Sequence, residues 1–320
     1  SKNVKNVEIA KNIISMYDKE SDDSVEKILQ LLKECDYNKN VLYLMANPIL
    51  QGRTVEEQIK LIRKLKTYNY NPSILEIIKN KNVLEYRTTE DQIRLIDELE
   101  NCNYNINVLF LIIDQNILKY RRTEDQIDLI ETLKECGYNT NILGIALNLV
   151  VLQSRTTEEQ IRLIDELKEH KYNSKMLNLM RNVNVLEYRT MEEQIELIDE
   201  LKNCDYNSKV LELITNKHLL MKRNISEQIK LIEELKKYNY SSQALSIIIL
   251  LNALYNKNIE DQIQELEKRM VGSAPATHEI SLDNINNIKE LRNYVEELKK
   301  EYQEDRHIEL TDEIKTKIKK

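Results

Sequence analysis

The dipeptide Gln-Ile returns along this chain at an unvarying step of 34 residues. Its glutamines are Gln58, Gln92, Gln126, Gln160, Gln194, Gln228 and Gln262. A fixed step without insertions indicates a tandem repeat, because each copy supplies one structural unit to a stack. A divergent earlier copy, SVEKILQLLKECDYN, ends at Asn38. The step predicts seven helix pairs and an eighth first helix that ends near Val271.

Each copy also carries the start and stop signals of a helix. Thr88 is followed three residues later by Asp91, the spacing of a capping box, and most other copies have the same pair of residue types. The apolar positions that follow predict a first helix, and the asparagine of a Tyr-Asn pair is a good cap for a second one. With four glycines, three prolines and no tryptophan, the composition favours an all-helical chain.

The second helix of each copy is predicted to be kinked or split in several copies. Pro48 falls in the middle of the earliest one, and other copies read KNKN or RNVN at this point. The letters ALNLVVL and IILLNAL of the fourth and seventh copies contain no comparable break. There we expect a continuous helix.

This layout resembles two families of helical scaffold. The 34-residue unit is similar in length to tetratricopeptide repeats, although the Trp, Gly and Pro of that family are absent, and a row of asparagines described below resembles armadillo repeats. The letters TEEQI at 157–161 also resemble the TPEQV start of the repeats of transcription-activator-like effectors, but the glycine-bearing base-reading loop of that family has no counterpart. The resemblances imply layout alone: a right-handed α-solenoid of about seven helix-turn-helix repeats, with a concave inner surface.

The period also divides the chain into segments. We predict a solenoid over 1–271, with a divergent cap and first repeat at 1–52, regular repeats at 53–257 and a final helix at 258–271. A linker, GSAPATHEIS, occupies 272–281. The segment 282–320 is predicted to hold a C-terminal amphipathic helix, which would dock on the solenoid, dimerise or bind another protein.

Residues in one register of a strict repeat form a ladder along the stack. Cys35, Cys102, Cys136 and Cys204 share such a register. Four cysteines spread along a rod cannot converge on one metal ion, and neighbours are too far apart for a disulfide. We interpret them as reduced packing residues, which favours the cytoplasm or another reducing compartment, although a native N-terminus with a targeting signal could precede the sequence.

An arginine ladder has two interpretations. It comprises Arg53, Arg87, Arg121, Arg155, Arg189 and Arg223. In the first, each guanidinium closes the end of the second helix and bridges to an acid on the neighbouring repeat. In the second, the row binds an acidic peptide or a phosphate backbone. We favour the structural interpretation, because a site shaped for one ligand need not be uniform.

A second ladder also has two interpretations. It comprises Asn80, Asp114, Asn148, Asn182 and Asn216. Its resemblance to the armadillo asparagine row implies that it holds the backbone of an extended peptide. The nearby Pro48 instead favours a turn inside the second helix, where asparagine is preferred for local reasons.

The positions that vary between copies are the best candidates for specificity. One register of the second helix reads Glu76, Phe110, Gly144, Asn178, Glu212, Ser246, and the register three residues later reads Lys79, Ile113, Leu147, Arg181, Thr215, Ile249. The two share a helix face. Phe110, Ile113 and Leu147 would form an apolar patch there, either a partner site or a surface that the next repeat buries.

The sequence therefore favours a binding protein over an enzyme. The four histidines have no metal-ligand spacing and no glycine-rich phosphate loop exists, so we expect no cofactor. The main hypothesis is a protein-interaction scaffold that holds a peptide or helix in its groove. The alternative is a nucleic-acid-binding repeat protein whose arginines follow phosphates, although the net charge of −7 is unfavourable. No apolar run approaches the length of a membrane span.

Overall fold

The computed structural model describes residues 2–17, 21–46, 48–254 and 258–271, and these are all-helical, with no strand among them. The chain divides into two compact units, unit 1 at 1–229 and unit 2 at 230–320, and the division falls within helix α19 (Ile225–Lys237). Unit 1 contains the complete cysteine, arginine and asparagine ladders. The last members of the glutamine row and of the two varying registers, Gln262, Ser246 and Ile249, lie in unit 2. The predicted linker and C-terminal helix lie outside the described residues.

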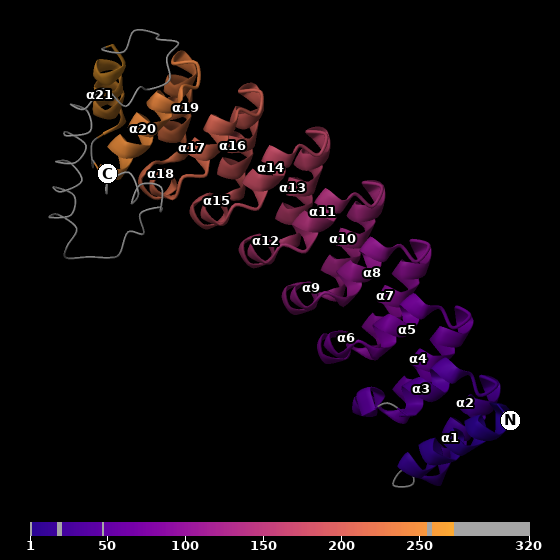
Figure 1. The fold of residues 1–320 in the computed structure, drawn as a ribbon. Helices are drawn as coiled ribbons and strands as arrows, with labels where there is room; N and C mark the ends of the chain where they lie inside the picture. Colours follow the sequence, from indigo (N-terminus) through magenta and orange to yellow (C-terminus); the bar gives the residue numbers. More distant parts are fainter. Residues whose placement is uncertain (1, 18–20, 47, 255–257, 272–320) are drawn as a thin grey trace, which may run out of the picture. The chain divides into compact units, whose positions relative to one another are not determined.

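Counted from the start of the first helix, each 34-residue unit between residues 55 and 224 contains three helices, because the predicted second helix is split (Figure 1). The first helices are α4 (Val55–Thr67), α7 (Thr89–Asn101), α10 (Thr123–Glu135), α13 (Thr157–Glu169) and α16 (Met191–Asn203). The second helices are α5 (Pro72–Lys79), α8 (Ile106–Ile113), α11 (Thr140–Ala146), α14 (Ser174–Met180) and α17 (Ser208–Ile214). The third helices are α6 (Lys81–Tyr86), α9 (Gln115–Tyr120), α12 (Leu149–Ser154), α15 (Val183–Tyr188) and α18 (Lys217–Lys222).

Like helices of successive units contact one another within unit 1. The third helices α6, α9, α12, α15 and α18 touch in that order and lie side by side along one edge in Figure 1. The second helices contact one another in the same sequence from α5 to α17, and each of α5, α8, α11 and α14 also contacts the first helix of the next unit. Leu and Ile side chains between these rows are fully buried, so each unit covers the apolar face of its neighbour.

The first helix starts as predicted and ends slightly earlier than predicted. Thr88 is the N-cap of α7, and its hydroxyl oxygen accepts a hydrogen bond of 3.1 Å from the backbone N–H of Asp91. The helix ends before the Tyr-Asn pair, because Asn103 and Tyr104 both have a left-handed backbone, with φ of 51° and 56°. Asn105 then caps α8, as expected.

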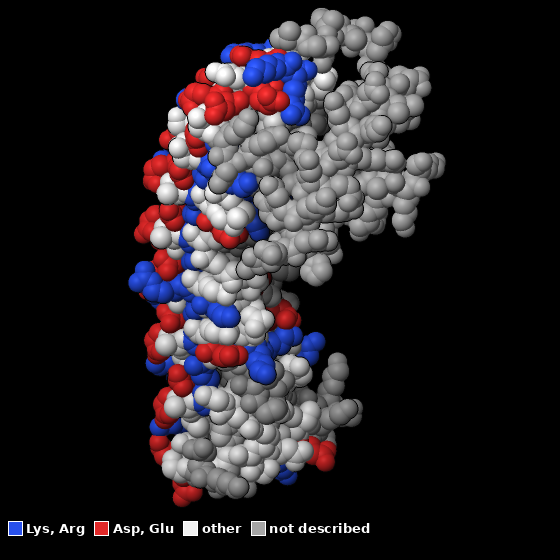
Figure 2. Space-filling view, turned by 90° about the vertical axis from the view of Figure 1, so that its left-hand side faces the viewer, with Lys and Arg blue, Asp and Glu red and all other residues white. Residues whose placement is uncertain are grey.

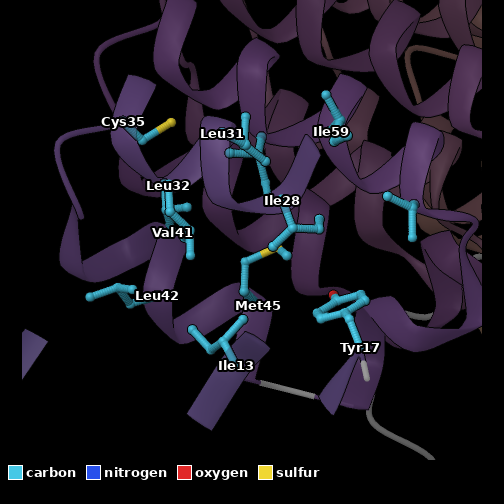
Figure 3. Close-up of a cluster of buried hydrophobic side chains, with 12 residues drawn as sticks. Ile13, Tyr17, Ile28, Leu31, Leu32, Cys35, Val41, Leu42, Met45 and Ile59 are labelled. Atoms are coloured by element: carbon cyan, nitrogen blue, oxygen red, sulfur yellow. The ribbon is translucent and has the colours of Figure 1, made fainter. Parts of the chain in front are cut away.

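A compact apolar cluster lies at the N-terminal end of unit 1. Helices α1 (Lys2–Met16), α2 (Asp22–Glu34) and α3 (Lys39–Ala46) pack together there, followed by the 3₁₀ helix η1 (Pro48–Gly52). Figure 3 shows Ile13 of α1 among side chains of α2 and α3. Tyr17, which directly follows α1, donates a hydrogen bond of 2.5 Å to Gln58 Oε1.

In unit 2, α20 (Ser242–Leu254) is continuous and contacts α21 (Ile259–Val271). The expectation of an unbroken second helix is therefore confirmed for the seventh copy. The described part of the chain ends with α21, at Val271.

Candidate functional site

The ladder arginines lie in the interior between successive 34-residue units. Arg87, Arg121, Arg155 and Arg189 are only 6–8 % exposed. The Arg121 guanidinium donates to the carbonyl oxygens of Tyr120, Leu152 and Arg155 at 2.9–3.1 Å. Its Nε and Nη2 also donate to Gln160 Oε1, at 3.2 and 3.0 Å. These bonds use all five N–H groups of the guanidinium, so none remains for a ligand.

The partner of each arginine is the glutamine of the Gln-Ile dipeptide that marks the repeat. Gln160 is fully buried in α13. While its Oε1 accepts from Arg121, its Nε2 donates to the carbonyl oxygens of Ile145 and Ala146 at the end of α11, at 3.1 and 3.0 Å. Only an amide can accept on one side and donate on the other in this way. The sequence showed this glutamine as a marker of the period but not as a structural group.

The same network repeats at four successive positions. Each glutamine stands 39 residues after its arginine, giving the pairs Arg87–Gln126, Arg121–Gln160, Arg155–Gln194 and Arg189–Gln228. The carbonyl oxygens that each arginine contacts in the next unit belong to the end of the third helix. The third helix is the later part of the predicted second helix, so the arginine does contact the helix end that was expected, while the glutamine contacts the end of α11.

The expected acidic partner of the arginines is wrong for these four positions. Each charge is held by carbonyl oxygens at a helix C-terminus and by one amide oxygen, which together supply the negative ends of several dipoles. Burial lowers the pKa of the Arg121 guanidinium, but arginine keeps its charge in proteins. The enclosed position disfavours the alternative in which this row binds an acidic peptide or phosphates.

The two outer arginines of the ladder differ from the central four. Arg53 is half-buried and donates to the carbonyl oxygens of Leu84 and Arg87, at 3.3 and 2.5 Å. Its Nε and the Oε1 of Gln92 are both buried without a hydrogen-bond partner in the described chain. Arg223 does have an acidic neighbour, since its Nη1 lies 3.4 Å from Glu227. The arginine–glutamine hydrogen bonds of the central four positions are therefore missing between Arg53 and Gln92.

The asparagine ladder forms the turns that split the second helices. Asn80, Asp114, Asn148, Asn182 and Asn216 are the N-caps of the five third helices. Asn148, for example, accepts a hydrogen bond of 3.1 Å from the backbone N–H of Val151. The turn interpretation is confirmed, and each cap oxygen is occupied by its own helix. The expectation of a continuous helix in the fourth copy is wrong, because Asn148 caps α12 there.

The cysteine ladder is buried and forms no disulfide. Cys35, Cys102, Cys136 and Cys204 are free thiols at most 8 % exposed. Burial raises the pKa of the Cys35 and Cys136 thiols. We therefore assign these residues to packing, as expected.

The varying register of the second helices lies on the surface. Phe110 is 48 % exposed, and Glu76, Asn178 and Glu212 in the same register are exposed as well. Ile113 and Leu147, three residues further along their own helices, are half-buried. The next unit therefore does not bury Phe110, which excludes for this residue the interpretation of the patch as a buried surface.

Three further exposed apolar residues lie in the same units and the next one. Ile106, one turn before Phe110 on α8, is 55 % exposed. Leu149 and Val183, the first residues of α12 and α15, are 41 % and 53 % exposed. We call Ile106, Phe110, Ile113, Leu147, Leu149 and Val183 the central apolar set. Four of its members, Ile113, Leu147, Leu149 and Val183, directly precede or follow the cap residue between a second and a third helix.

Charged side chains form balanced pairs on the first helices. Lys60 lies 2.8 Å from Glu90, Arg94 lies 2.7 Å from Glu124, and the same 30-residue spacing recurs at Arg162 and Glu192. Figure 2 shows basic and acidic side chains interleaved along the edge of the face in view. Such exposed pairs contribute little to stability individually. Their alternation gives these helices no single sign of charge.

Comparison with known proteins gives no relative: no family model and no curated protein matches the chain. No cluster of His, Cys, Asp or Glu suited to holding a metal ion occurs in the described segments. In those same segments, every helix is too short or too polar to cross a membrane.

Proposed function

We propose that the repeated units form a right-handed α-solenoid that acts as a non-enzymatic protein-interaction scaffold. In this proposal the central apolar set receives a peptide or a helix of the partner. The observation that carries it is the division between constant and varying positions. The central constant arginines and the constant glutamines are enclosed and hydrogen-bonded, and the cap oxygens are bonded to their own helices, whereas Phe110 in the varying register is open to solvent.

The composition of the central set supports a protein partner. Exposed aromatic and branched aliphatic side chains are typical anchors of protein interfaces, since their desolvation on binding is favourable. Phe110 is the single phenylalanine of the chain and lies one helix turn from the equally exposed Ile106. At the position of Phe110, the preceding unit has Glu76, the next unit has Gly144 and the one after it has Asn178, so a large apolar side chain occurs at this position only in the unit of Phe110 among these four.

Peptide selection tests the proposal. A displayed library of random peptides is selected on the full chain, and bound clones are retested on Phe110→Asp and Asn178→Asp. Both variants place a carboxylate in the same exposed register, so Asn178→Asp controls for added charge. We expect Phe110→Asp to weaken binding at least tenfold, which corresponds to about 1.4 kcal/mol, with unchanged helical circular dichroism. Equal binding by the wild type and Phe110→Asp would refute the site.

A further inference from the structure

One arginine of unit 1 lies in the varying register and outside the ladder. Arg181 directly follows α14 and is half-buried. Its Nη1 is 3.4 Å from the point where a Cβ would stand on Gly144 of α11. The absence of a side chain at Gly144 thus leaves room for the guanidinium to lie over the neighbouring second helix.

Within the described residues, the Arg181 side chain has no polar partner. Among the arginines that the structure describes in residues 1–229, it alone makes neither a hydrogen bond nor an ion pair through its guanidinium. The exposed arginines Arg63, Arg94 and Arg162 each pair with a glutamate of another helix, and Arg122 pairs with Asp125. Thr215, the next member of Arg181's register, carries no charge, and Glu212 lies 3.9 Å from Lys209.

Apolar residues adjoin this free cation in sequence and register. Leu147 stands three residues after Gly144, and Val183 stands two residues after Arg181. Arg181 approaches Gly144 across 37 residues of sequence, and the same separation relates Leu147 to Phe110. The Arg181 guanidinium therefore lies beside α11, the helix that Leu147 directly follows.

We infer that the partner is a peptide that carries a carboxylate beside an apolar anchor, with the carboxylate bound by Arg181. This inference rests on the proposed function and specifies its ligand. A planar guanidinium and a carboxylate form two parallel hydrogen bonds. One unpaired positive charge among apolar side chains matches a singly charged carboxylate better than a doubly charged phosphate.

The geometry sets the spacing within the peptide. The Arg181 guanidinium approaches α11 at Gly144, and Leu147 lies three residues further along, where helix neighbours are roughly 5–6 Å apart. An extended peptide rises about 3.3 Å per residue. The carboxylate is therefore expected about two residues from the apolar anchor in an extended ligand.

Matched peptides and protein variants test the inference. Peptides selected on the full chain for binding that depends on Phe110 are synthesised with their Asp or Glu, with the corresponding Asn or Gln, and with phosphoserine at that position. We expect a carboxylate to be enriched at a constant distance from an apolar residue, and its removal to weaken binding about tenfold. Arg181→Gln should weaken binding by a similar factor, and combining the two changes should add little more.

Two further variants control the experiment. Arg122→Gln removes an exposed arginine from the start of a first helix and should leave affinity unchanged. Arg181→Lys should restore only part of the affinity, since it keeps the charge but not the fork. Because Arg181 makes no polar contact in the fold, Arg181→Gln should melt within about 2 °C of the wild type. A larger fall in melting temperature would assign Arg181 to the fold and overturn the inference.

The possible failures are distinguishable. The inference is contradicted, and the proposed function is not, by peptides that require Phe110 but show no enrichment of a carboxylate. The same holds if removal of the carboxylate weakens binding to Arg181→Gln as much as it weakens binding to the wild type. Tighter binding of the phosphoserine peptides contradicts the carboxylate assignment alone. Failure to recover any peptide that depends on Phe110 contradicts both.

Discussion

At the scale of single residues, the paired arginine and glutamine define the contact between successive units. Gln160, for example, donates to the carbonyl oxygen of Ile145 at the end of α11 and accepts from Arg121. Arg121 in turn donates to the carbonyl oxygen of Leu152 at the end of α12. A glutamate would lose the donor, and a lysine would lose the fork. This requirement explains why both residue types recur where so much else varies.

Removal of one ladder arginine tests this role. Arg121→Ala leaves the Gln160 amide oxygen and the carbonyl oxygens of Leu152 and Arg155 without their buried donor. We expect a loss of about 3 kcal/mol in the free energy of unfolding, measured by urea denaturation followed by circular dichroism. Arg122→Ala is the matched control, because the neighbouring Arg122 side chain is exposed, and its loss should be within about 0.5 kcal/mol. Equal losses in the two variants would contradict the structural role of the ladder.

The capping carboxylates predict a pH dependence. The backbone N–H of Thr54 donates to Glu57 at 2.8 Å, and the Thr89 hydroxyl donates to its other oxygen. These bonds lower the pKa of Glu57. A carboxyl whose pKa is lower in the folded state stabilises the fold above its unfolded pKa, and this contribution is lost as the pH falls through the folded pKa.

We therefore expect the melting temperature of the protein to decrease as the pH is lowered below about 4.5. Glu57→Gln keeps the shape of the capping box without a titrating group. Its melting temperature should depend less on pH in that range, by differential scanning calorimetry. The same acid-induced fall in both proteins would exclude Glu57 as a contributor.

At the scale of elements, one cap residue decides whether the second helix is split. The five units with Asn or Asp in the cap register all break there, whereas the seventh copy has Leu250 at this position and forms the continuous α20. The letters ALNLVVL concealed the break in the fourth copy, because apolar residues surround the single asparagine. The first helices were predictable from their caps and apolar pattern, but the turn was not, since a capping side chain acts against the surrounding helix propensity.

Asn148→Ala tests the cap at this element. The substitution removes the acceptor for the Val151 N–H and should destabilise the protein by about 1 kcal/mol. Asn178→Ala changes the same residue type at an exposed helical position and should change stability by less than about 0.5 kcal/mol. Urea midpoints of the two variants give the comparison. An Asn148→Ala midpoint at or above that of the control would mean that the turn does not depend on the cap.

Across the whole molecule, the repeated residues join the units to one another. In the proposed function, the residues that vary between units bind the partner. The sequence located the varying register and Phe110, because a strict period makes each departure visible. It did not show that the arginines are enclosed, since burial of a charged row depends on partners 39 residues away. Nor did it show that Arg181 lacks a polar partner among the described residues. That property depends on the positions of all the polar groups around the guanidinium, which the sequence does not contain.

The most direct test of this division is an isothermal titration of one selected peptide into wild type, Phe110→Asp, Asn178→Asp and Arg121→Ala, each at a temperature where circular dichroism shows it folded. The account predicts that Phe110→Asp alone loses affinity, by tenfold or more, while Arg121→Ala binds within about twofold of wild type despite its lower stability. Loss of binding in folded Arg121→Ala, together with normal binding in Phe110→Asp, would place recognition on the repeated arginines and contradict the account.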